Sequence, residues 1–208
     1  MRNPVLKKLH MEDKEFVTSE EIKSYCSTFD INYYNTIRNL LSRGYLLRIF
    51  RGIFYVKTLE EVKFGKTKYS HLDLVSRGME LKGVSAWYFG LNTALKMNNA
   101  THEHFTVEHV LNDSIFRRDS MEIAGHEFKF TKLKKELFGF GVIEDPYMHS
   151  DIDKTILDFI YLWRYNGKEE KRILMDISEY REYITEDRIR RYAEHYPKTV
   201  KQTMEELL

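Results

Sequence analysis

The sequence predicts an α+β protein: an N-terminal winged helix-turn-helix, then a mixed α/β domain with a helical C-terminal part. Two observations carry this prediction. Residues 1–59 show three helical patterns and then a short hairpin, which is the element order of a winged helix-turn-helix. After residue 73, helical and strand-like segments are mixed, and from Ser150 onward the pattern is helical. The predicted domains are residues 1–59 and 73–208, joined by a polar linker over residues 60–72.

The first two helices are predicted from apolar spacing and a capping pattern. The stretch RNPVLKKLH places Val5, Leu6 and Leu9 on one side of a short helix. In TSEEIKSYC, Thr18 and Glu21 fit a capping box that opens the second helix. Its apolar stripe is predicted to contain Ile22, Tyr25, Cys26 and Phe29.

A third helix is predicted from about Asn32 to Arg43, ending at Gly44. Its inward face is predicted to contain Ile37, Leu40 and Leu41, with Tyr33 or Tyr34. Its outward face is predicted to contain Asn32, Asn35, Thr36, Arg38, Asn39 and Arg43. These side chains are mostly of the types that read base edges, because asparagine pairs with adenine and arginine with guanine.

The stretch GYLLRIFRGIFYV predicts a hairpin directly after this helix, with Arg51 and Gly52 at its tip. Arg48 and Arg51 would then lie beside the third helix, where they meet phosphates or the minor groove. The predicted DNA-contacting residues are therefore Asn32, Tyr33, Asn35, Thr36, Arg38, Asn39 and Arg43 of the helix, with Arg48 and Arg51 of the hairpin.

The distribution of charge supports this interpretation, although the net charge is only +1. Residues 31–59 contain five basic residues and no acidic one, whereas residues 145–208 contain 14 acidic and 11 basic residues. A local basic surface is typical of a site that binds nucleic acid. A helical module that binds only protein remains a weaker alternative.

The second domain is predicted to begin with two helices, LDLVSRGMELKG and the strongly apolar VSAWYFGLNTALKMN. Strands follow, including a hairpin in which residues 121–124 pair with residues 127–131. Ser150 and Asp153 fit a second capping box before the helix SDIDKTILDFIYLWRYNG, and two or three short helices complete the chain.

Composition excludes several classes of protein. No apolar run reaches about 18 residues, so no membrane span is predicted, and the N-terminus has no apolar core of a signal peptide. The single cysteine, Cys26, cannot form an internal disulfide. These features predict a cytoplasmic protein.

Two clusters raise the alternative of a nucleic-acid-processing enzyme targeted by the winged helix. His102, Glu103, His104 and His109 lie close together in the sequence, but a third metal ligand at a convincing spacing is missing. Asp151, Asp153, Lys154 and Asp158 resemble the carboxylate-lysine set of a nuclease, but such a site needs acids on adjacent strands to hold Mg²⁺. The capping pattern explains Asp153, and the helix surface explains the others. No Walker loop, dinucleotide fingerprint or serine elbow is present in the sequence. We therefore predict no enzyme activity, catalytic residue, metal or cofactor.

The module from Thr18 to Val56 resembles the N-terminal winged helix of the AbiEi-like antitoxins, regulators of type IV toxin-antitoxin and abortive-infection systems. The stretches VSAWYFGL, LFGFGVIEDP and IDKTILDFIYLWRY follow in the order of that family, with Asp153 where the family has glutamate. The resemblance implies a repressor that binds the operator of its own operon as double-stranded DNA. It also implies that the second domain counters a nucleotidyltransferase-like toxin. The oligomeric state and the operator stay open.

Overall fold

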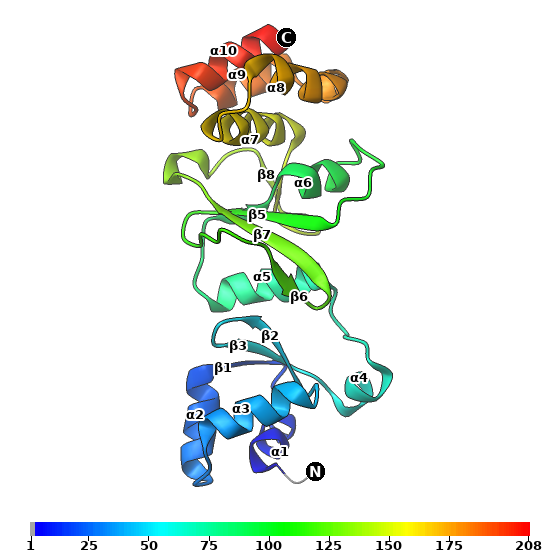
Figure 1. Ribbon diagram of the computed structural model, residues 1–208, viewed down its shortest axis with the longest axis vertical. Helices are drawn as coiled ribbons and strands as arrows, with labels where there is room; N and C mark the ends of the chain where they lie inside the picture. The colour runs from blue at the N-terminus through cyan, green and yellow to red at the C-terminus, as the bar shows by residue number, and fades with distance from the viewer. Residues whose placement is uncertain (1–2) are drawn as a thin grey trace. The chain divides into compact units, whose positions relative to one another are not determined.

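Residues 3–208 are described by a computed structural model, and the chain divides into two units (Figure 1). Unit 1 runs to Gly83 and includes Ile123–Gly125, whereas unit 2 comprises Val84–Glu122 and His126–Leu208. Both units combine helices with a sheet, which confirms the predicted α+β class.

Unit 1 has the element order of a winged helix-turn-helix. Its elements are α1 (Pro4–Met11), β1 (Phe16–Thr18), α2 (Ser19–Thr28), α3 (Tyr33–Ser42), β2 (Leu46–Phe50) and β3 (Ile53–Val56). The three antiparallel strands are ordered β1-β3-β2. Strand β1, which no pattern in the sequence predicted, pairs Thr18 with Ile53 and so attaches the start of α2 to the hairpin.

The predicted starts and ends of the first three helices are confirmed to within a few residues. Thr18 and Glu21 form the capping box of α2, and the Asn32 side chain caps α3. After α3, Gly44 adopts a left-handed backbone with φ of 70°, which glycine adopts without steric cost. The core between these helices and the sheet contains Val5, Leu6, Leu9, Val17, Ile22, Cys26, Ile37, Leu40, Leu46, Phe54 and Val56. Of the predicted stripe on α2, Phe29 is exposed and Tyr25 is half-buried.

The region between the units differs from the predicted linker over residues 60–72. A short helix, α4 (Leu59–Phe64), begins there with a capping box formed by Thr58 and Glu61. Helix α5 (His71–Leu81), which we predicted to open the second domain, packs instead on β2 and β3 of unit 1. Its Gly78 lies so close to Ile49 and Phe50 that an added Cβ would be 2.6 Å from Ile49. The sheet of unit 1 is therefore covered by α5.

Unit 2 contains a mixed sheet ordered β6-β7-β5-β4-β9-β8. Its strands are β4 (Trp87–Phe89), β5 (Val107–Asn112), β6 (Met121–Ile123), β7 (His126–Lys132), β8 (Val142–Ile143) and β9 (His149–Ser150). The predicted helix over VSAWYFGLNTALKMN is wrong in its first half, because β4 is a buried central strand, and only α6 (Leu91–Met97) is helical. Three consecutive aromatic residues favour a strand that packs on both faces.

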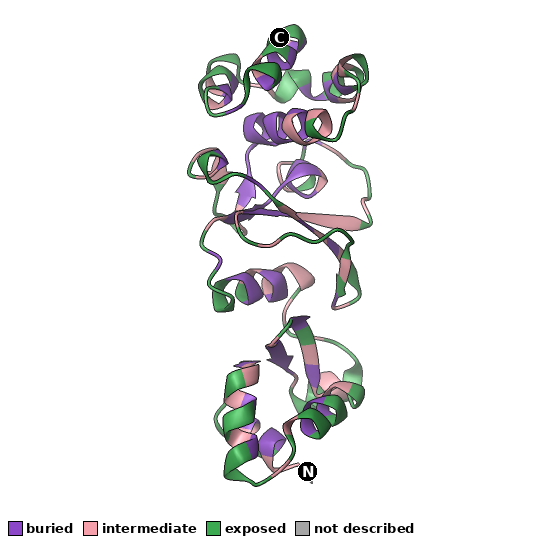
Figure 2. Ribbon diagram, turned by 60° about the vertical axis from the view of Figure 1, so that its left-hand side comes forward, coloured by how far each residue is buried: buried purple, intermediate pink, exposed green. Residues whose placement is uncertain are grey.

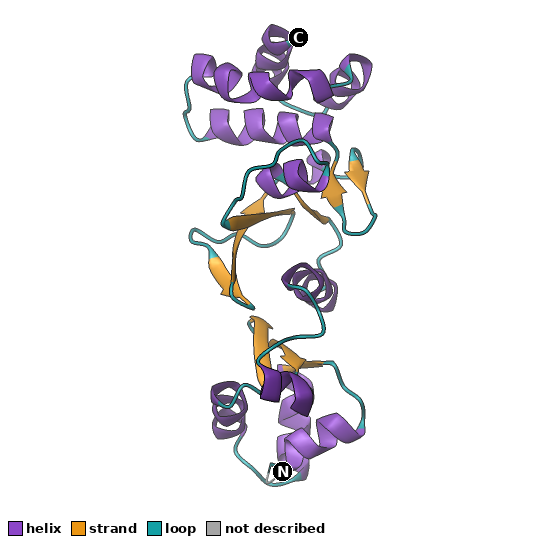
Figure 3. Ribbon diagram, turned by 90° about the vertical axis from the view of Figure 1, so that its right-hand side faces the viewer, coloured by secondary structure: helices purple, strands orange, loops and turns teal. Residues whose placement is uncertain are grey.

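Helices cover one side of this sheet. The long helix α7 (Ile152–Tyr165) lies between the sheet and the terminal elements α8 (Glu170–Ile177), η2 (Ser178–Tyr183), α9 (Glu186–Ala193) and α10 (Lys198–Leu207) (Figure 3). A short turn of 3₁₀ helix, η1 (Lys135–Leu137), precedes β8. Residues 152–160 of α7 are all buried, which makes α7 the centre of the unit 2 core (Figure 2).

Candidate nucleic-acid interface

The exposed side of α3 forms the candidate interface. Asn35, Arg38, Asn39 and Arg43 are exposed, as predicted. At about 3.6 residues per turn, they fall on one continuous arc together with Tyr34 and Ser42. The Arg38 guanidinium donates a hydrogen bond of 3.2 Å to the Asn35 side chain, so the two side chains present donors side by side. We call this set of six residues the α3 arc.

Three predicted contact residues on α3 have other roles. Thr36 is buried, with 6% of its surface exposed, because it lies one turn before Leu40 on the inward face. The Asn32 side chain accepts a hydrogen bond of 2.9 Å from the Asn35 backbone N–H and so caps the helix. The Tyr33 ring is half-buried, and its hydroxyl group donates to Ser19 Oγ at 2.9 Å. Thr36 is therefore removed from the predicted interface.

Tyr34 is a candidate contact residue that the sequence analysis did not assign to DNA. Its side chain is 77% exposed, and its ring packs edge-on against Tyr33 at 5.2 Å. An exposed tyrosine on a helix of this size offers a hydroxyl for a phosphate and a ring for a thymine methyl group. The signal in the sequence was its helical position, four residues before Arg38 on the same face.

The hairpin tip is fixed to the start of α2. Ser19 N donates a hydrogen bond of 2.8 Å to the Gly52 carbonyl oxygen, and Gly52 has a positive φ of 82°. A residue with a Cβ at this position would be strained, which agrees with the predicted sharp turn. Arg51 is exposed at this anchored tip.

Arg48 lies on the shaft of the hairpin, beside a register shift between Arg48 and Phe50. Its guanidinium lies 5.8 Å from the centre of the Phe54 ring, at the distance of a cation–π contact. Arg48 is exposed, yet part of its side chain supports the strand pair. Arg51 is thus the hairpin residue best placed to meet a phosphate.

In the described part of the chain, the arginines of α3 and the hairpin are not neutralised by nearby acidic side chains. Residues 31–59 carry no carboxylate, and within residues 3–208 no salt bridge neutralises Arg38, Arg43, Arg48 or Arg51. Cations that form no ion pair keep their full charge available for an incoming polyanion. The α3 arc and Arg51 therefore form a polar, positively charged surface on unit 1.

In unit 2, the charged residues of SDIDKTILD are buried rather than exposed on a helix surface. Asp153, Lys154 and Asp158 have no exposed surface, which corrects the prediction that the cap and the surface account for them. The cap of α7 is Asp151, whose side chain accepts from Lys154 N at 2.9 Å, so Ser150 is not the cap. Ser150 instead lies in β9.

Each buried charge has a protein partner. Lys154 Nζ donates to the Leu137 carbonyl oxygen at 2.7 Å and lies 3.6 Å from Asp158. The hydroxyl groups of Tyr88 and Tyr196 each donate to Asp158 at 2.7 Å. Burial lowers the pKa of Lys154 and raises the pKa of Asp158, while their mutual attraction favours the charged forms.

The remaining carboxylates of this region are also bonded to protein groups. Asp153 accepts from the Thr185 backbone N–H at 2.9 Å and from the Arg188 guanidinium. Asp151 accepts from the Tyr192 hydroxyl group at 3.1 Å. Across residues 3–208, no group of three histidine, cysteine or acidic side chains is arranged to hold a metal ion. The carboxylates of α7 therefore stabilise the packing of α7 against α9 and the sheet.

Comparisons with known proteins show the fold alone. No protein-family model matches the chain, and no relative is found among curated proteins. The crystal structure of the RV2827C protein from Mycobacterium tuberculosis is similar, with a TM-score of 0.60 and 10% sequence identity. The similarity covers 98% of this chain and 74% of that one. In the part of the chain that the structure describes, no helix has the length and apolar character needed to cross a membrane.

Proposed function

We propose that the protein is a DNA-binding transcriptional regulator whose unit 1 places α3 in the major groove. The observation that carries the proposal is the α3 arc, which presents amide, hydroxyl and guanidinium groups beside a hairpin without carboxylates. An α-helix fits the major groove, where these groups distinguish base pairs. Arg51 at the anchored tip supplies a phosphate contact that fixes the orientation of the helix.

The second half of the proposal assigns the protein the role of an antitoxin that represses its own operon. Its support is the resemblance of the motifs, in their order, to the AbiEi-like antitoxins. Unit 2 would then bind a nucleotidyltransferase-like toxin encoded in the same operon. Both roles place the protein in the cytoplasm.

The buried carboxylates favour this proposal over the nuclease alternative. A nuclease site needs carboxylates that converge on a metal ion and face the substrate. Asp153 and Asp158 instead have no exposed surface and accept hydrogen bonds from Thr185, Tyr88 and Tyr196. Their geometry suits a structural role inside unit 2.

Selection of binding sites from random duplex DNA tests the first half. We expect the full-length protein to enrich one sequence and to retard it in gel-shift titrations. The variant Arg38→Ala with Asn39→Ala should lose that preference. The matched control is Arg191→Ala with Gln202→Ala, which removes one guanidinium and one amide from exposed positions of α9 and α10. Failure to enrich any sequence, or equal losses in both variants, would contradict the proposal.

Co-expression tests the second half. A nucleotidyltransferase encoded beside this gene should slow growth, and the full-length protein should restore it. A reporter fused to the operon promoter should be repressed by the same protein. Restored growth without repression would support the antitoxin role and contradict the role of repressor. Repression without restored growth would support the repressor and contradict the antitoxin role.

A further inference from the structure

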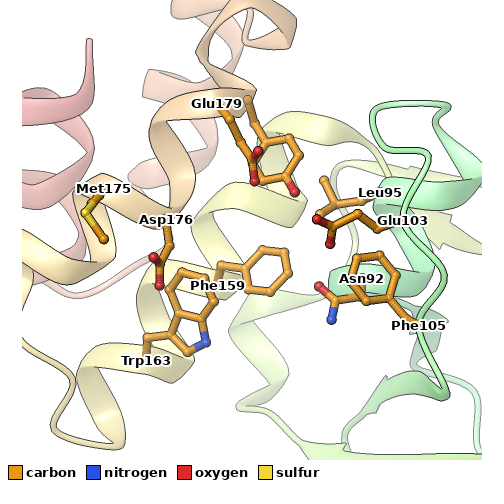
Figure 4. Close-up of a pocket in the computed structure, with 10 residues that line it drawn as sticks. Asn92, Leu95, Glu103, Phe105, Phe159, Trp163, Met175, Asp176 and Glu179 are labelled. Atoms are coloured by element: carbon orange, nitrogen blue, oxygen red, sulfur yellow. The ribbon is translucent and has the colours of Figure 1, made fainter.

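Unit 2 contains a pocket of about 340 Å³ that the proposed DNA interface does not use. It lies among α6, α7, α8 and the loop that follows α6, far along the chain from the α3 arc (Figure 4). Its volume falls near the lower end of the range of ligand pockets, about 300–1,000 Å³. A pocket of this size accommodates one side chain or a small ligand.

The lining combines aromatic rings with carboxylates. The rings are Phe105, Phe159, Trp163 and Tyr180, and the carboxylates are Glu103, Asp176 and Glu179. Figure 4 shows Glu103 and Phe105 on one side of the pocket and Trp163 and Asp176 on the other, with the Phe159 ring between them. No lysine or arginine lines the pocket among the described residues. This chemistry favours a cation, because ring faces and carboxylates both attract positive charge.

A lysine of the chain already contacts one side of the pocket lining. Lys168 Nζ lies 3.5 Å from the centre of the Trp163 ring and 2.5 Å from the Asp176 carboxylate. One carboxylate of the pocket is thus neutralised from within the protein. Glu103 and Glu179 are exposed, and no salt bridge to either is present within residues 3–208. The Tyr180 hydroxyl group bonds to Glu179, but neither carboxylate has a counter-charge among the described residues, so both can attract an incoming positive group.

We infer that this pocket receives the guanidinium group of an arginine side chain from a partner protein. A guanidinium is planar, stacks on aromatic rings and donates to two carboxylates at once. The pocket is open at a rim where Met175 is 56% exposed, which gives the methylene groups of an arginine an apolar contact. Arginine and aromatic residues are also the residues that dominate protein interfaces. The identity of the partner rests on the antitoxin half of the proposed function, but the binding chemistry does not.

The test follows the indole N–H signals of the full-length protein by NMR while blocked amino acids are added. The chain has two tryptophans, and Trp87 in β4 does not line this pocket, so its signal is an internal control. Nα-acetyl-arginine methylamide should shift the Trp163 signal in a saturable manner and leave the Trp87 signal in place. Nα-acetyl-citrulline methylamide, which has nearly the same shape but no charge, should not shift it.

Charge variants of the pocket complete the test. Glu103→Gln with Glu179→Gln should weaken binding of the arginine amide about tenfold, at about threefold for each exposed carboxylate. The control variant, Glu136→Gln with Glu206→Gln, removes the same charge from exposed positions outside the pocket and should bind like the wild type.

Three results would overturn the inference: no shift of the Trp163 signal, an equal shift with citrulline amide, or tighter binding of lysine amide or choline. Neither DNA nor toxin is present in this experiment. Its failure would therefore leave the regulator and antitoxin proposals to their own tests.

Discussion

The charged residues of unit 1 and those of α7 in unit 2 differ in where they lie and in what neutralises them. On unit 1, Arg38, Arg43 and Arg51 are exposed and form no salt bridge within residues 3–208. On α7, Lys154 and Asp158 are fully buried, pair with each other and accept or donate further hydrogen bonds. Exposed charges that form no salt bridge are available to a ligand, whereas buried, paired charges stabilise one packing arrangement.

A high density of charged residues in a sequence therefore does not by itself indicate an exposed surface. The apolar residues between Ile152 and Ile160 fall on about half of the helix circumference, and Lys154, Thr155 and Asp158 share the opposite side. Both sides are nevertheless buried. Asp151, Lys154 and Asp158 lie three and four residues apart and thus share one face, which indicates that they act together. This spacing predicts a shared face, whereas the burial of that face depends on the segments that pack against α7.

The first prediction breaks the buried pair and has the largest expected effect. Lys154→Ala leaves the Asp158 carboxylate buried without its cation, so the free energy of unfolding should fall by about 3–5 kcal/mol. Urea unfolding followed by circular dichroism measures the change. The control Lys171→Ala removes an exposed lysine of α8 and should change the free energy of unfolding by less than about 0.5 kcal/mol.

A double variant distinguishes two causes of the lost stability, an unpaired buried charge and the loss of side-chain packing. Lys154→Met with Asp158→Asn removes both charges and keeps an acceptor for the Tyr88 hydroxyl group. It should be more stable than Lys154→Ala, because no unpaired charge is left inside the protein. Equal losses for Lys154→Ala and Lys171→Ala would show that Lys154 is not buried as a charged partner of Asp158.

The second prediction concerns His109 in β5, a half-buried residue whose buried Nδ1 atom has no hydrogen-bond partner. Burial lowers the pKa of His109 from 6.5 to about 4. The unfolded chain binds a proton below about pH 6.5, whereas the folded protein does so near pH 4. Stability should therefore fall as the pH drops through this window, by about 3 kcal/mol in total at about 1.4 kcal/mol per pH unit.

Unfolding in urea at several pH values between 7 and 4 checks this prediction. His109→Phe cannot take up a proton, so its unfolding free energy should depend less on pH in that window. If both proteins lose stability at the same rate, other groups account for the acid sensitivity, and His109 is not a source of it.

Local patterns predicted much of unit 1, since helix caps and apolar spacing act over a few residues. The capping box of Thr18 and Glu21 and the tip at Gly52 both lie where these patterns place them. The missed features depend on contacts between distant segments. Strand β1 has three residues and is defined by its pairing with β3, and α5 joins unit 1 because its Gly78 fits against Ile49 and Phe50.

At the candidate site, too, features set by local sequence patterns were predicted and features set by contacts between distant segments were not. Arg38, Asn35 and Asn39 were predicted correctly to be exposed, because helical periodicity separates them from Ile37 and Leu40. Thr36 was predicted incorrectly, since a threonine at the border of the two faces is buried or exposed according to how the helix packs. The pocket around Trp163 joins α6, α7 and α8 across some 90 residues of chain, so no local pattern predicted it.

The third prediction concerns one of the exposed charges of unit 1, Arg38. Arg38→Ala should weaken binding to the selected operator by about 1–3 kcal/mol and relax the preference at one base pair. Because Arg38 is exposed and its side chain bonds to the exposed Asn35 within α3, the melting temperature should stay the same. Gel-shift titrations against operators that differ at single base pairs measure both effects, and unchanged sequence preference would exclude a base contact.

The last and smallest effects distinguish Arg51 from Arg48 on the hairpin. Arg51 lies at the anchored tip, whereas the Arg48 guanidinium already lies over the Phe54 ring. A phosphate contact releases counterions, so Arg51→Ala should flatten the slope of log affinity against log salt by about one unit and leave the melting temperature unchanged. Arg48→Ala should change that slope less and lower the melting temperature slightly, because a cation–π contact at an exposed site stabilises by about 0.5–1 kcal/mol. Lys198→Ala in α10 provides a control that removes an exposed cation from unit 2 and should alter neither quantity. If Arg48→Ala alone flattens the salt slope, the shaft of the hairpin rather than its tip contacts the phosphates. Arg48 would then be a DNA-contacting residue and not a structural one.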